Sequence, residues 1–373
     1  MSSILQVVPA LNAGGVERTT IEIAHALKAA GFTPLVASEG GRLEGELAEA
    51  GGELIRIQAS TKLPHTLIAN ALRLAAIARE RDVKLIHARS RAPAWSALMA
   101  ARSARVPFVT TYHGIYNAGN PLKRFYNSVM VRADAVIANS AWTAQHILAE
   151  HKIDPGKLTV IPRGVDLARF DPAGIPPDAV AALRAEWGAG PDDIVVLLPG
   201  RLTRWKGQTV LIEAMARLAD PRVHAVLIGD AQGRAAYEAE LRNAISASSA
   251  KVTLAGHTAD MPRAYLAADI VVSASTDPEA FGRVAAEASA MGRPVIATDH
   301  GGARETVLPG MTGLLTAPGS AIELAGALAQ LLRLDASSLA AMGAHGRAHI
   351  VDRYSLGRMC ADTLALYRKL IAP

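Results

Sequence analysis

The sequence predicts an α/β protein made of two doubly wound parallel sheets. Short apolar runs alternate with longer amphipathic helical patterns through most of the 373 residues, as in parallel strands joined by helices. This alternation occurs twice, on either side of a proline- and glycine-rich stretch, residues 166–191. Aromatic residues make up only 4% of a chain that is 50% hydrophobic, so aliphatic residues must fill the buried strands.

The first half of the chain contains seven predicted strands separated by helices such as Thr19–Ala30 and His65–Arg81. These strands are Leu5–Val8, Thr33–Ala37, Leu54–Ile57, Leu85–Ala88, Phe108–Thr111, Ala135–Ala138 and Thr159–Ile161. The stretch 166–191, with Asp171-Pro172, Gly174 and Pro176-Pro177, is interpreted as a linker followed by a first helix. We therefore expect one Rossmann-like domain in residues 1–170 and a second in residues 171–354.

The predicted strands of the second half follow the same rhythm, and a helix at Ser355–Leu370 ends the chain. These strands are Ile194–Leu198, His224–Ile228, Val252–Leu254, Ile270–Ser273, Val295–Ala297 and Gly313–Leu315. Since ligands of such sheets bind outside the carboxyl ends of the strands, the loops that follow the strands are the places to look for a site.

Composition narrows the class of protein. A formal net charge of +5 and a pI near 9.4 fit anionic partners such as nucleotide phosphates or lipid head groups, or ordinary solubility charge. A nucleic-acid partner is disfavoured, because no basic stripe is interleaved with aromatic residues. The single cysteine, Cys360, excludes an intramolecular disulfide, and no Cys/His cluster has zinc spacing. Without signal-peptide or membrane-spanning patterns, we expect a cytoplasmic protein, with contact to a membrane surface left open.

Two glycines follow the first predicted strand. Gly14 and Gly15, within Asn12–Glu17, open the first helix, where a backbone without side chains and a helix N-terminus favour an anion. The spacing is not that of the dinucleotide-binding fingerprint, so a structural tight turn and a binding loop both remain open.

His113 and Asn139-Ser140 end the next strands in the same manner. A histidine there can point into the ligand crevice or make a structural hydrogen bond. Ser140 is predicted to cap the helix that starts at Ala141.

The loop from Pro199 to Gly207 is the strongest phosphate signal in the sequence. It follows the first strand of the second half and leads into a helix at Gly207. Arg201 can fork onto phosphate oxygens, and Lys206 supplies a point charge beside a helix N-terminus. The alternative is a solvated basic loop anchored by Trp205. Later in the chain, Gly229-Asp230 and Gly256-His257-Thr258 also end strands, where a base or ribose, or a plain turn, would fit.

Two carboxylates eight positions apart, Glu279 and Glu287, flank the start of the helix predicted at Ala285–Met291. The first lies in a loop beside Gly282, above the carboxyl end of strand Ile270–Ser273. A second glycine pair, Gly301-Gly302, follows the next strand. The second half thus gathers acids, cations and glycines at one predicted sheet edge.

The run from Glu279 to Glu287 resembles the E-x7-E signature of retaining glycosyltransferases of family 4, which have the GT-B fold. The segments 199–207, 161–166, 265–269 and 301–305 resemble that family's conserved segments in the same order. The resemblance covers nearly the whole chain. It implies two Rossmann-like domains and a C-terminal helix, residues 355–373, that returns to the first domain.

The same resemblance implies transfer of a sugar from a nucleotide-sugar donor with retention of configuration. Arg201 and Lys206 would hold the diphosphate. Glu287 would bind the ribose, and Glu279 with the amides of Phe281 and Gly282 would contact the sugar. In the first domain, Gly15 would place its amide on the distal phosphate. His113 would meet the primary hydroxyl of the sugar or the developing charge. The further donor-binding candidates are Gly229, His257, Thr258 and Arg283.

Three positions depart from the commoner family pattern: Ala280, Arg283 and Arg163. The two arginines would add positive charge near the phosphates or the sugar, so they affect the expected donor more than the expected chemistry. A glycosidase-type acid pair is rejected, because hydrolysis would not need a diphosphate site. No D-x-D triplet is present, and we expect no metal or other cofactor, with UDP- or GDP-sugar as substrate.

The expected acceptor is a glycan or lipid-linked saccharide, in synthesis of a lipopolysaccharide-type envelope polymer. Its predicted surface in the first domain includes Arg89-Ser90-Arg91, Trp95 and Pro121–Tyr126. The last segment mixes cations with aromatics, as a surface that touches anionic lipid on the inner face of the membrane would; a solvated helix start is the alternative. A non-hydrolysing sugar-nucleotide epimerase and a non-catalytic nucleotide-sugar-binding subunit are the rival functions.

Overall fold

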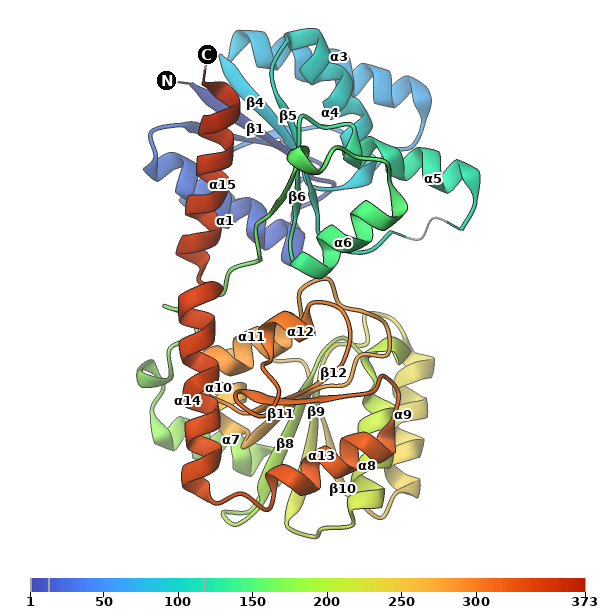
Figure 1. Cartoon of the computed structure of the whole chain (residues 1–373), viewed down its shortest axis with the longest axis vertical. Helices are drawn as coiled ribbons and strands as arrows, with labels where there is room; N and C mark the ends of the chain where they lie inside the picture. Colours follow the sequence, from blue (N-terminus) through green and yellow to red (C-terminus); the bar gives the residue numbers. More distant parts are fainter. Residues whose placement is uncertain (1, 13, 117–118, 373) are drawn as a thin grey trace. The chain divides into compact units, whose positions relative to one another are not determined.

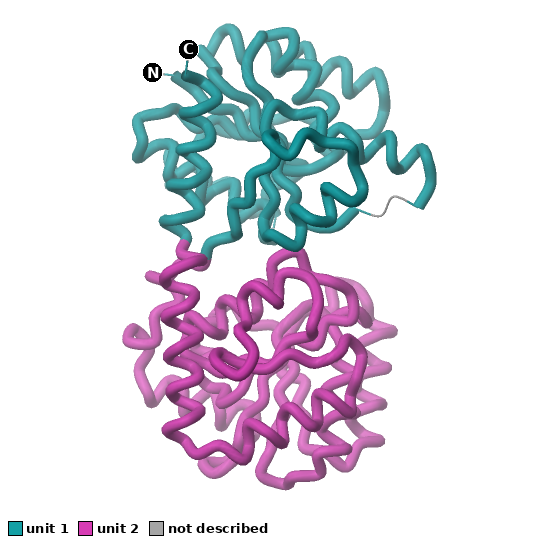
Figure 2. Tube along the Cα trace, viewed as in Figure 1, with its two compact units in different colours: residues 1–164, 356–373 teal, residues 165–355 magenta. Residues whose placement is uncertain are grey.

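The computed structural model describes residues 2–12, 14–116 and 119–372, and the chain divides into two compact units (Figure 2). Unit 1 comprises residues 1–164 and 356–373, and unit 2 comprises residues 165–355. The sequence prediction places the first boundary after residue 170, later than the structure does. It places the second boundary after residue 354, one residue earlier than the structure does. Phe170, Leu183 and Trp187 explain the first difference, because all three are buried in the core of unit 2. The segment interpreted as a linker is therefore largely part of a folded unit.

Unit 1 contains a seven-stranded parallel sheet in the order β3-β2-β1-β4-β5-β6-β7. Its strands are β1 Ser3–Val7, β2 Thr33–Ser38, β3 Glu53–Arg56, β4 Val83–Ala88, β5 Phe108–Tyr112, β6 Ala135–Ala138 and β7 Leu158–Val160. The order reverses between β1 and β4, which opens a crevice at the carboxyl ends of these two strands.

Helices cover both faces of this sheet. They are α1 Gly15–Ala29, α2 Glu44–Glu49, α3 Pro64–Glu80, α4 Arg91–Ala104, α5 Pro121–Asn127, α6 Ala141–Glu150 and α15 Leu356–Ile371. The helices α3 and α4 pack against each other and share a core with one face. On the other face, α15 lies beside α1 (Figure 1), where Tyr367 is buried with Ile4, Ile23 and Leu27. The last helix of the chain therefore packs into unit 1.

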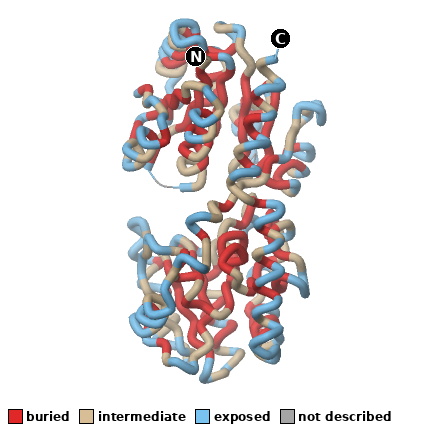
Figure 3. Tube along the Cα trace, turned by 90° about the vertical axis from the view of Figure 1, so that its left-hand side faces the viewer, coloured by how far each residue is buried: buried red, intermediate tan, exposed pale blue. Residues whose placement is uncertain are grey.

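Unit 2 contains a six-stranded parallel sheet in the order β10-β9-β8-β11-β12-β13. Its strands are β8 Ile194–Pro199, β9 Val223–Ile228, β10 Lys251–Gly256, β11 Ile270–Ser273, β12 Val295–Thr298 and β13 Gly313–Thr316. Here the order reverses between β8 and β11. The inner strands β8, β9, β11 and β12 are buried because helices cover the two faces of the sheet, whereas the edge strand β10 is only partly buried. Figure 3 shows the buried residues gathered in the interior of each unit.

The helices of unit 2 form two groups with separate cores. They are α7 Pro177–Glu186, α8 Gln208–Leu218, α9 Ala235–Ala247, α10 Met261–Ala267, α11 Arg283–Ala290, α12 Ala303–Thr306, α13 Ala321–Leu331 and α14 Ala336–Arg353. Short 3-10 turns lie at Ser128–Val131 and Pro155–Lys157 in unit 1 and at Pro172–Gly174 and Arg204–Lys206 in unit 2. Within the described ranges, no helix has both the length and the apolar character needed to cross a membrane.

Local chemistry explains where several of these elements begin. Ser140 caps α6 as predicted, since its hydroxyl accepts a hydrogen bond from the Thr143 amide. The helix predicted at Gly207 begins one residue later, because Gly207 is left-handed at φ 73° and forms the N-cap of α8. The helix α11 likewise begins after a left-handed residue, Gly282, at φ 84°. It therefore starts at Arg283, ahead of the predicted Ala285.

Candidate functional site

The two groups predicted to hold the diphosphate and the sugar are hydrogen-bonded to each other in unit 2. Lys206 ends the 3-10 turn that follows β8, and Glu279 lies in the loop that follows β11. The distance from Lys206 Nζ to Glu279 Oε1 is 2.6 Å. The Ser275 hydroxyl donates to the same carboxylate oxygen at 2.5 Å. The sheet brings these residues together because β8 and β11 are the neighbours at which the strand order reverses.

This pair is partly buried, with 12% of the Lys206 side chain and 16% of the Glu279 side chain exposed. Burial by itself raises the pKa of Glu279, but the charge and hydrogen bond of Lys206 and the Ser275 hydroxyl outweigh it, so the pKa lies below its ordinary value. The Lys206 ammonium also lies 4.3 Å from the centre of the Trp205 ring. The Glu279 carboxyl is therefore ionised at neutral pH.

Glu287 is held by two further side chains on α11 and α10. Its Oε1 accepts hydrogen bonds from Arg283 Nη2 at 2.6 Å and Arg283 Nε at 3.1 Å. Its Oε2 accepts one from the buried Tyr265 hydroxyl at 3.0 Å. Burial and the Glu287 charge raise the pKa of Tyr265 well above its ordinary value, so Tyr265 is a hydroxyl donor. Glu287 is only 8% exposed, and its carboxylate is fixed before any ligand arrives.

The glycine pair after β12 packs on the backbone of the Glu279 loop. The Gly302 amide donates to the Glu279 carbonyl at 2.8 Å. Gly301 is left-handed at φ 62°, and a Cβ there would overlap the same carbonyl. A side chain at either position would displace this loop, since a Cβ at Gly302 would meet the backbone of Phe281. Phe281 is buried and packs edge-on against Tyr354, with ring centres 5.6 Å apart. The pair therefore fixes the position of the first acid.

The other donor-binding candidates lie at the carboxyl ends of β8, β9 and β10. Arg201 is exposed, and in the described part of the chain its guanidinium makes no hydrogen bond or ion pair. Gly229 is packed so closely on Gly200 that a Cβ would overlap its carbonyl. His257 is exposed, and Thr258 accepts a hydrogen bond from the Asp260 amide. These contacts fit a binding edge with Arg201 available and a turn at Thr258.

The predicted residues of unit 1 form a second cluster. Gly15 begins α1, and a Cβ there would overlap the guanidinium of Arg163. The Arg163 Nη2 donates to His113 Nδ1 at 2.9 Å. Burial, with the charges of Arg163 and Arg89, lowers the pKa of His113 well below its ordinary range. His113 is therefore a neutral imidazole next to two cations. Ala13, in the predicted glycine loop, lies outside the described residues.

The predicted acceptor surface needs one correction. Arg89 is only 2% exposed, so it belongs to the interior of unit 1 and not to a surface. Its Nε donates to the buried Gln6 Oε1, an arrangement that the basic run in the sequence does not reveal. By contrast, Leu122 and Phe125 on α5 are 80% and 60% exposed. The Phe125 ring stacks on Trp95, with centres 5.2 Å apart.

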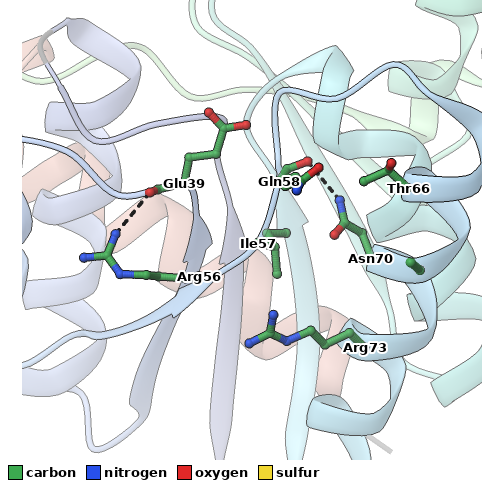
Figure 4. Close-up of a pocket in the computed structure, with 8 residues that line it drawn as sticks. Glu39, Arg56, Ile57, Gln58, Thr66, Asn70 and Arg73 are labelled. Carbon is green, nitrogen blue, oxygen red and sulfur yellow. Dashed lines mark hydrogen bonds between the residues drawn. The ribbon is translucent and has the colours of Figure 1, made fainter.

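A groove in unit 1, of about 470 Å³, has no counterpart in the sequence prediction. It lies beside the ends of β2 and β3 and the start of α3 (Figure 4). Its polar lining residues are Glu39, Arg56, Gln58, Thr66, Asn70 and Arg73. The Asn70 amide donates to the Gln58 carbonyl, and Arg56 to the Glu39 carbonyl, so the lining is partly ordered by its own hydrogen bonds.

Three residues that support the acids were not assigned a role from sequence. Ser275 and Tyr265 hold Glu279 and Glu287 directly. His300, just before the glycine pair, contributes to lowering the pKa of Glu279. Each had a signal in the sequence, since Ser275 and His300 closely follow strands and Tyr265 begins the segment 265–269 that resembles the family. No three His, Cys, Asp or Glu side chains in the described ranges are placed to hold a metal ion together.

The fold and the acids at the unit 2 switch point define a class, the glycosyltransferases of GT-B architecture. A solved glycosyltransferase from Rickettsia africae is 35% identical, with a TM-score of 0.91 over 99% of this chain and 98% of that one. Anabaena Alr3699/HepE, solved in complex with UDP-glucose, is 29% identical, with a TM-score of 0.84 over 98% of this chain and 100% of that one.

Residues 13–169 match the family described as Glycosyltransferase Family 4, and residues 180–349 match Glycosyl transferases group 1. The chain belongs to this glycosyltransferase family. It is 32% identical, over 70% of its length, to the D-inositol 3-phosphate glycosyltransferase of Segniliparus rotundus, of which it spans 61%. It is also 32% identical, over 81% of its length, to a GDP-mannose-dependent monoacylated alpha-(1-6)-phosphatidylinositol monomannoside mannosyltransferase of Corynebacterium glutamicum, of which it spans 80%.

Proposed function

We propose that this protein transfers a sugar from a nucleotide-diphosphate-sugar to a glycan or glycolipid acceptor, with retention of the anomeric configuration. The observation that carries the proposal is the partly buried pair of Lys206 and Glu279 at the strand-order reversal of unit 2, with 2.6 Å between Lys206 Nζ and Glu279 Oε1. Glu287 is fixed on the adjacent helix. A nucleotide-sugar is a ligand with a ribose, a diphosphate and a sugar in a row, and these side chains match its parts in that order.

The donor would be held by charge and hydrogen bonding. The Glu287 carboxylate accepts two donors on Oε1 and one on Oε2, so lone-pair capacity remains on Oε2 for a ribose hydroxyl. The exposed Arg201 guanidinium would fork onto phosphate oxygens, and Lys206 would reach the same diphosphate. Glu279 would receive the hydroxyls of the sugar. Gly229, His257 and Thr258 would border the base and ribose.

In the reaction, the bond between the anomeric carbon and the phosphate oxygen breaks, and its electron pair leaves with the diphosphate. The transition state is oxocarbenium-like, so stabilising the growing negative charge is the main electrostatic task. Lys206 and Arg201 supply that positive charge. The acceptor hydroxyl attacks from the face that the diphosphate leaves, and its proton passes to a phosphate oxygen. Glu279 is engaged by Lys206 and Ser275, which supports an electrostatic role over that of a covalent nucleophile.

Because two protein cations meet the diphosphate, we propose that turnover needs no metal ion. Activity should therefore persist after dialysis against a chelator. If activity is lost with the chelator and restored by magnesium or manganese, this part of the proposal is wrong.

Unit 1 would supply the acceptor site and the remaining donor contacts. The Gly15 amide would meet the distal phosphate, and the neutral His113 would contact the sugar. The groove of Figure 4 supports acceptor binding in this unit, since its amide and guanidinium groups match sugar hydroxyls. Arg73 at this groove is expected to affect acceptor use alone. Replacing Arg73 with alanine should raise the acceptor KM and leave donor affinity unchanged.

We further propose an acceptor of the cell envelope and a contact with anionic lipid through α5. The exposed Leu122 and Phe125, beside Lys123 and Arg124, support this contact. Flotation with vesicles of anionic lipid tests it. Binding should be lost on Lys123→Glu/Arg124→Glu and retained on Arg217→Glu, a charge reversal on α8. Equal binding by both variants would exclude this surface.

The decisive experiment combines donor binding with product analysis. UDP-, GDP- and ADP-sugars are screened for protection against thermal unfolding, because a ligand of the folded state raises stability. The relatives support UDP- or GDP-sugars as the first candidates. The best donor is then tested for transfer, and NMR of the product reads the anomer. Inversion of the anomer would contradict retention.

The same assay separates the rival functions. Release of UDP without any acceptor would favour an epimerase. Donor binding without turnover would favour a non-catalytic subunit. Glu279→Gln and Lys206→Ala should each lower transfer by a factor of about 100 or more, in line with loss of one transition-state contact, and near-normal turnover in either variant would sink the proposal.

A further inference from the structure

Unit 1 contains a buried arginine whose hydrogen bonds are incomplete. Arg89 follows β4, and its Nε donates to Gln6 Oε1 at 2.7 Å. Gln6 is itself fixed, because its Nε2 donates to the Thr20 carbonyl at 3.0 Å. The Arg89 Nη2 is buried and has no hydrogen-bond partner among residues 2–12, 14–116 and 119–372. A buried donor of a charged group without an acceptor is costly, which suggests that an acceptor is supplied from outside the chain.

A second unsatisfied donor lies close by. Arginine can only donate, so His113 Nδ1 must accept the hydrogen bond from Arg163 Nη2. The neutral ring then carries its proton on Nε2. This Nε2 is also buried, and in the part of the chain that the structure describes it has no partner. The direction of the Arg163 bond thus makes His113 a donor.

Both residues line one cavity, which has no acid in its wall. The cavity has a volume of about 20 Å³ and is lined by Arg89, His113 and Arg163 together with Thr19, Thr111, Ile137, Asn139, Ile161, Met359 and Thr363. None of these described lining residues is Asp or Glu. Burial lowers the pKa of Arg89, and Tyr367, Cys360 and Glu22, none of which lines the cavity, act in the opposite direction. Two unsatisfied donors, Arg89 Nη2 and His113 Nε2, therefore lie at a cavity whose described lining contains no carboxylate.

We propose that this cavity binds one oxyanion group, a carboxylate or a phosphoryl group, whose oxygens accept hydrogen bonds from Arg89 Nη2 and His113 Nε2. Guanidinium groups pair best with such planar or tetrahedral oxyanions. One water needs about 10–15 Å³ of such space, so the cavity has room for one oxygen of the group, and the rest of the group must lie outside the cavity. The cavity lies within unit 1 and shares His113 with the proposed sugar contact, whereas Lys206 and Arg201 of the proposed diphosphate site belong to unit 2.

Thermal unfolding tests the proposal without any nucleotide-sugar. The wild-type protein is melted in sodium chloride and in acetate or phosphate at equal ionic strength. At several times Kd, the oxyanion should raise the unit 1 transition by about 2–4 °C, and the rise should saturate. Arg89→Met should abolish the rise. Arg79→Met should keep it, since Arg79 is an exposed arginine of the same unit that bonds only Ser103 among the described residues. No rise in the wild type, or an equal rise in Arg89→Met, would overturn the proposal.

A crystallographic measurement avoids dependence on the folding of a variant. Wild-type crystals are soaked in selenate, whose anomalous signal locates the anion. The expected result is a bound selenate whose oxygens lie about 3 Å from Arg89 Nη2 and His113 Nε2. Peaks confined to surface arginines would mean an adventitious ion only and would overturn the assignment.

The source of the oxyanion is resolved by comparing anionic sugars with free anions. Half-saturation by glucose 6-phosphate or glucuronate at a lower concentration than by phosphate or acetate would assign the group to a sugar substrate. Equal half-saturation would assign a free anion, and either result retains the site. The Glu279→Gln variant should keep the anion response although it loses transfer, so failure of this proposal and failure of the proposed function are distinguishable.

Discussion

Replacing Lys206 with methionine should destabilise unit 2, and the loss should shrink as the pH falls. The side chains of Lys206 and Glu279 are 12% and 16% exposed, with 2.6 Å between Nζ and Oε1. At an effective dielectric constant of about 20, Coulomb's law gives an attraction of roughly 6 kcal/mol at this distance. Much of that attraction offsets the cost of burying the two charges. Methionine keeps the length of the side chain and removes only the charge.

Protonation of Glu279 limits the size of the loss. Without Lys206, burial raises the pKa of Glu279 above the ordinary carboxyl value of 4.5. The folded variant can then take up a proton instead of holding an isolated buried charge. At about pH 7 this costs at most roughly 3.4 kcal/mol, because each pKa unit corresponds to about 1.36 kcal/mol. We therefore expect a loss of about 3 kcal/mol near pH 7.

The pH dependence follows from the two pKa values of Glu279. In the wild type the folded pKa is lowered, so the pair contributes fully above pH 4.5 and is lost as the pH falls through the folded pKa. In the variant the folded pKa is raised, so between 4.5 and that pKa the folded state binds more protons than the unfolded state. Its stability then rises by about 1.4 kcal/mol for each pH unit of acidification. The difference from the wild type should fall below about 1 kcal/mol near pH 5.

Denaturant titrations near pH 7 and pH 5 measure this by tryptophan fluorescence, to which Trp187 and Trp205 of unit 2 contribute along with Trp95 and Trp142 of unit 1. The control is Arg217→Met, which removes an ion pair with Glu213 whose side chains are 49% and 58% exposed. It should cost less than about 0.5 kcal/mol at either pH. Adding Glu279→Gln to Lys206→Met should recover stability near pH 7. A loss that is independent of pH, with additive effects in the double variant, would refute the reasoning.

Tyr265→Phe removes one hydrogen bond to the buried Glu287 carboxylate, a contact worth about 1.5 kcal/mol, and should weaken UDP binding about tenfold by calorimetry; unchanged affinity would argue against ribose binding at Glu287. Gly301→Ala forces a Cβ into the neighbouring carbonyl and should lower turnover about tenfold or more. Gly310→Ala is the control, because Gly310 has a similar φ of 77° and no atoms near the position of the added Cβ. Equal effects of the two variants would point to backbone strain alone. His113→Gln should flatten the loss of stability below pH 6.5: the folded pKa of His113 is lowered, so the unfolded state binds more protons there, at about 1.4 kcal/mol per pH unit. Identical pH profiles of stability would contradict a neutral buried His113.

The positions of the strands could be predicted from the sequence, but their ends could not. Each predicted apolar run corresponds to a strand, yet the run at Val252–Leu254 is the middle of β10, Lys251–Gly256. Backbone pairing continues into Lys251, which is exposed. A run of apolar side chains reports burial, whereas a strand is defined by hydrogen bonds of the backbone.

The sequence predicted which loops form the candidate site, but it did not predict which side chains pair with each other there. Topology alone brings the loops after β8 and β11 together, so Lys206 and Glu279 were placed at one edge of a sheet. Nothing in a linear pattern shows that they would bond to each other, or that Tyr265 would reach Glu287 from another helix. Arg89 is the sharpest case, because arginine is rarely buried and a basic run normally indicates a surface.

The two units differ in whether the cations near the point of strand-order reversal are paired with carboxylates. In unit 2 the partly buried cations Lys206 and Arg283 are each paired with a carboxylate. In unit 1 the wall of the cavity at Arg89 holds cations and donors without an acid among the described residues. Since an uncompensated buried charge destabilises a fold, the stability of unit 1 should depend on the anions in solution. That of unit 2 should depend on its own acids and on pH. Unfolding the wild type in different sodium salts at constant pH would therefore move the transition of unit 1 and leave that of unit 2 in place.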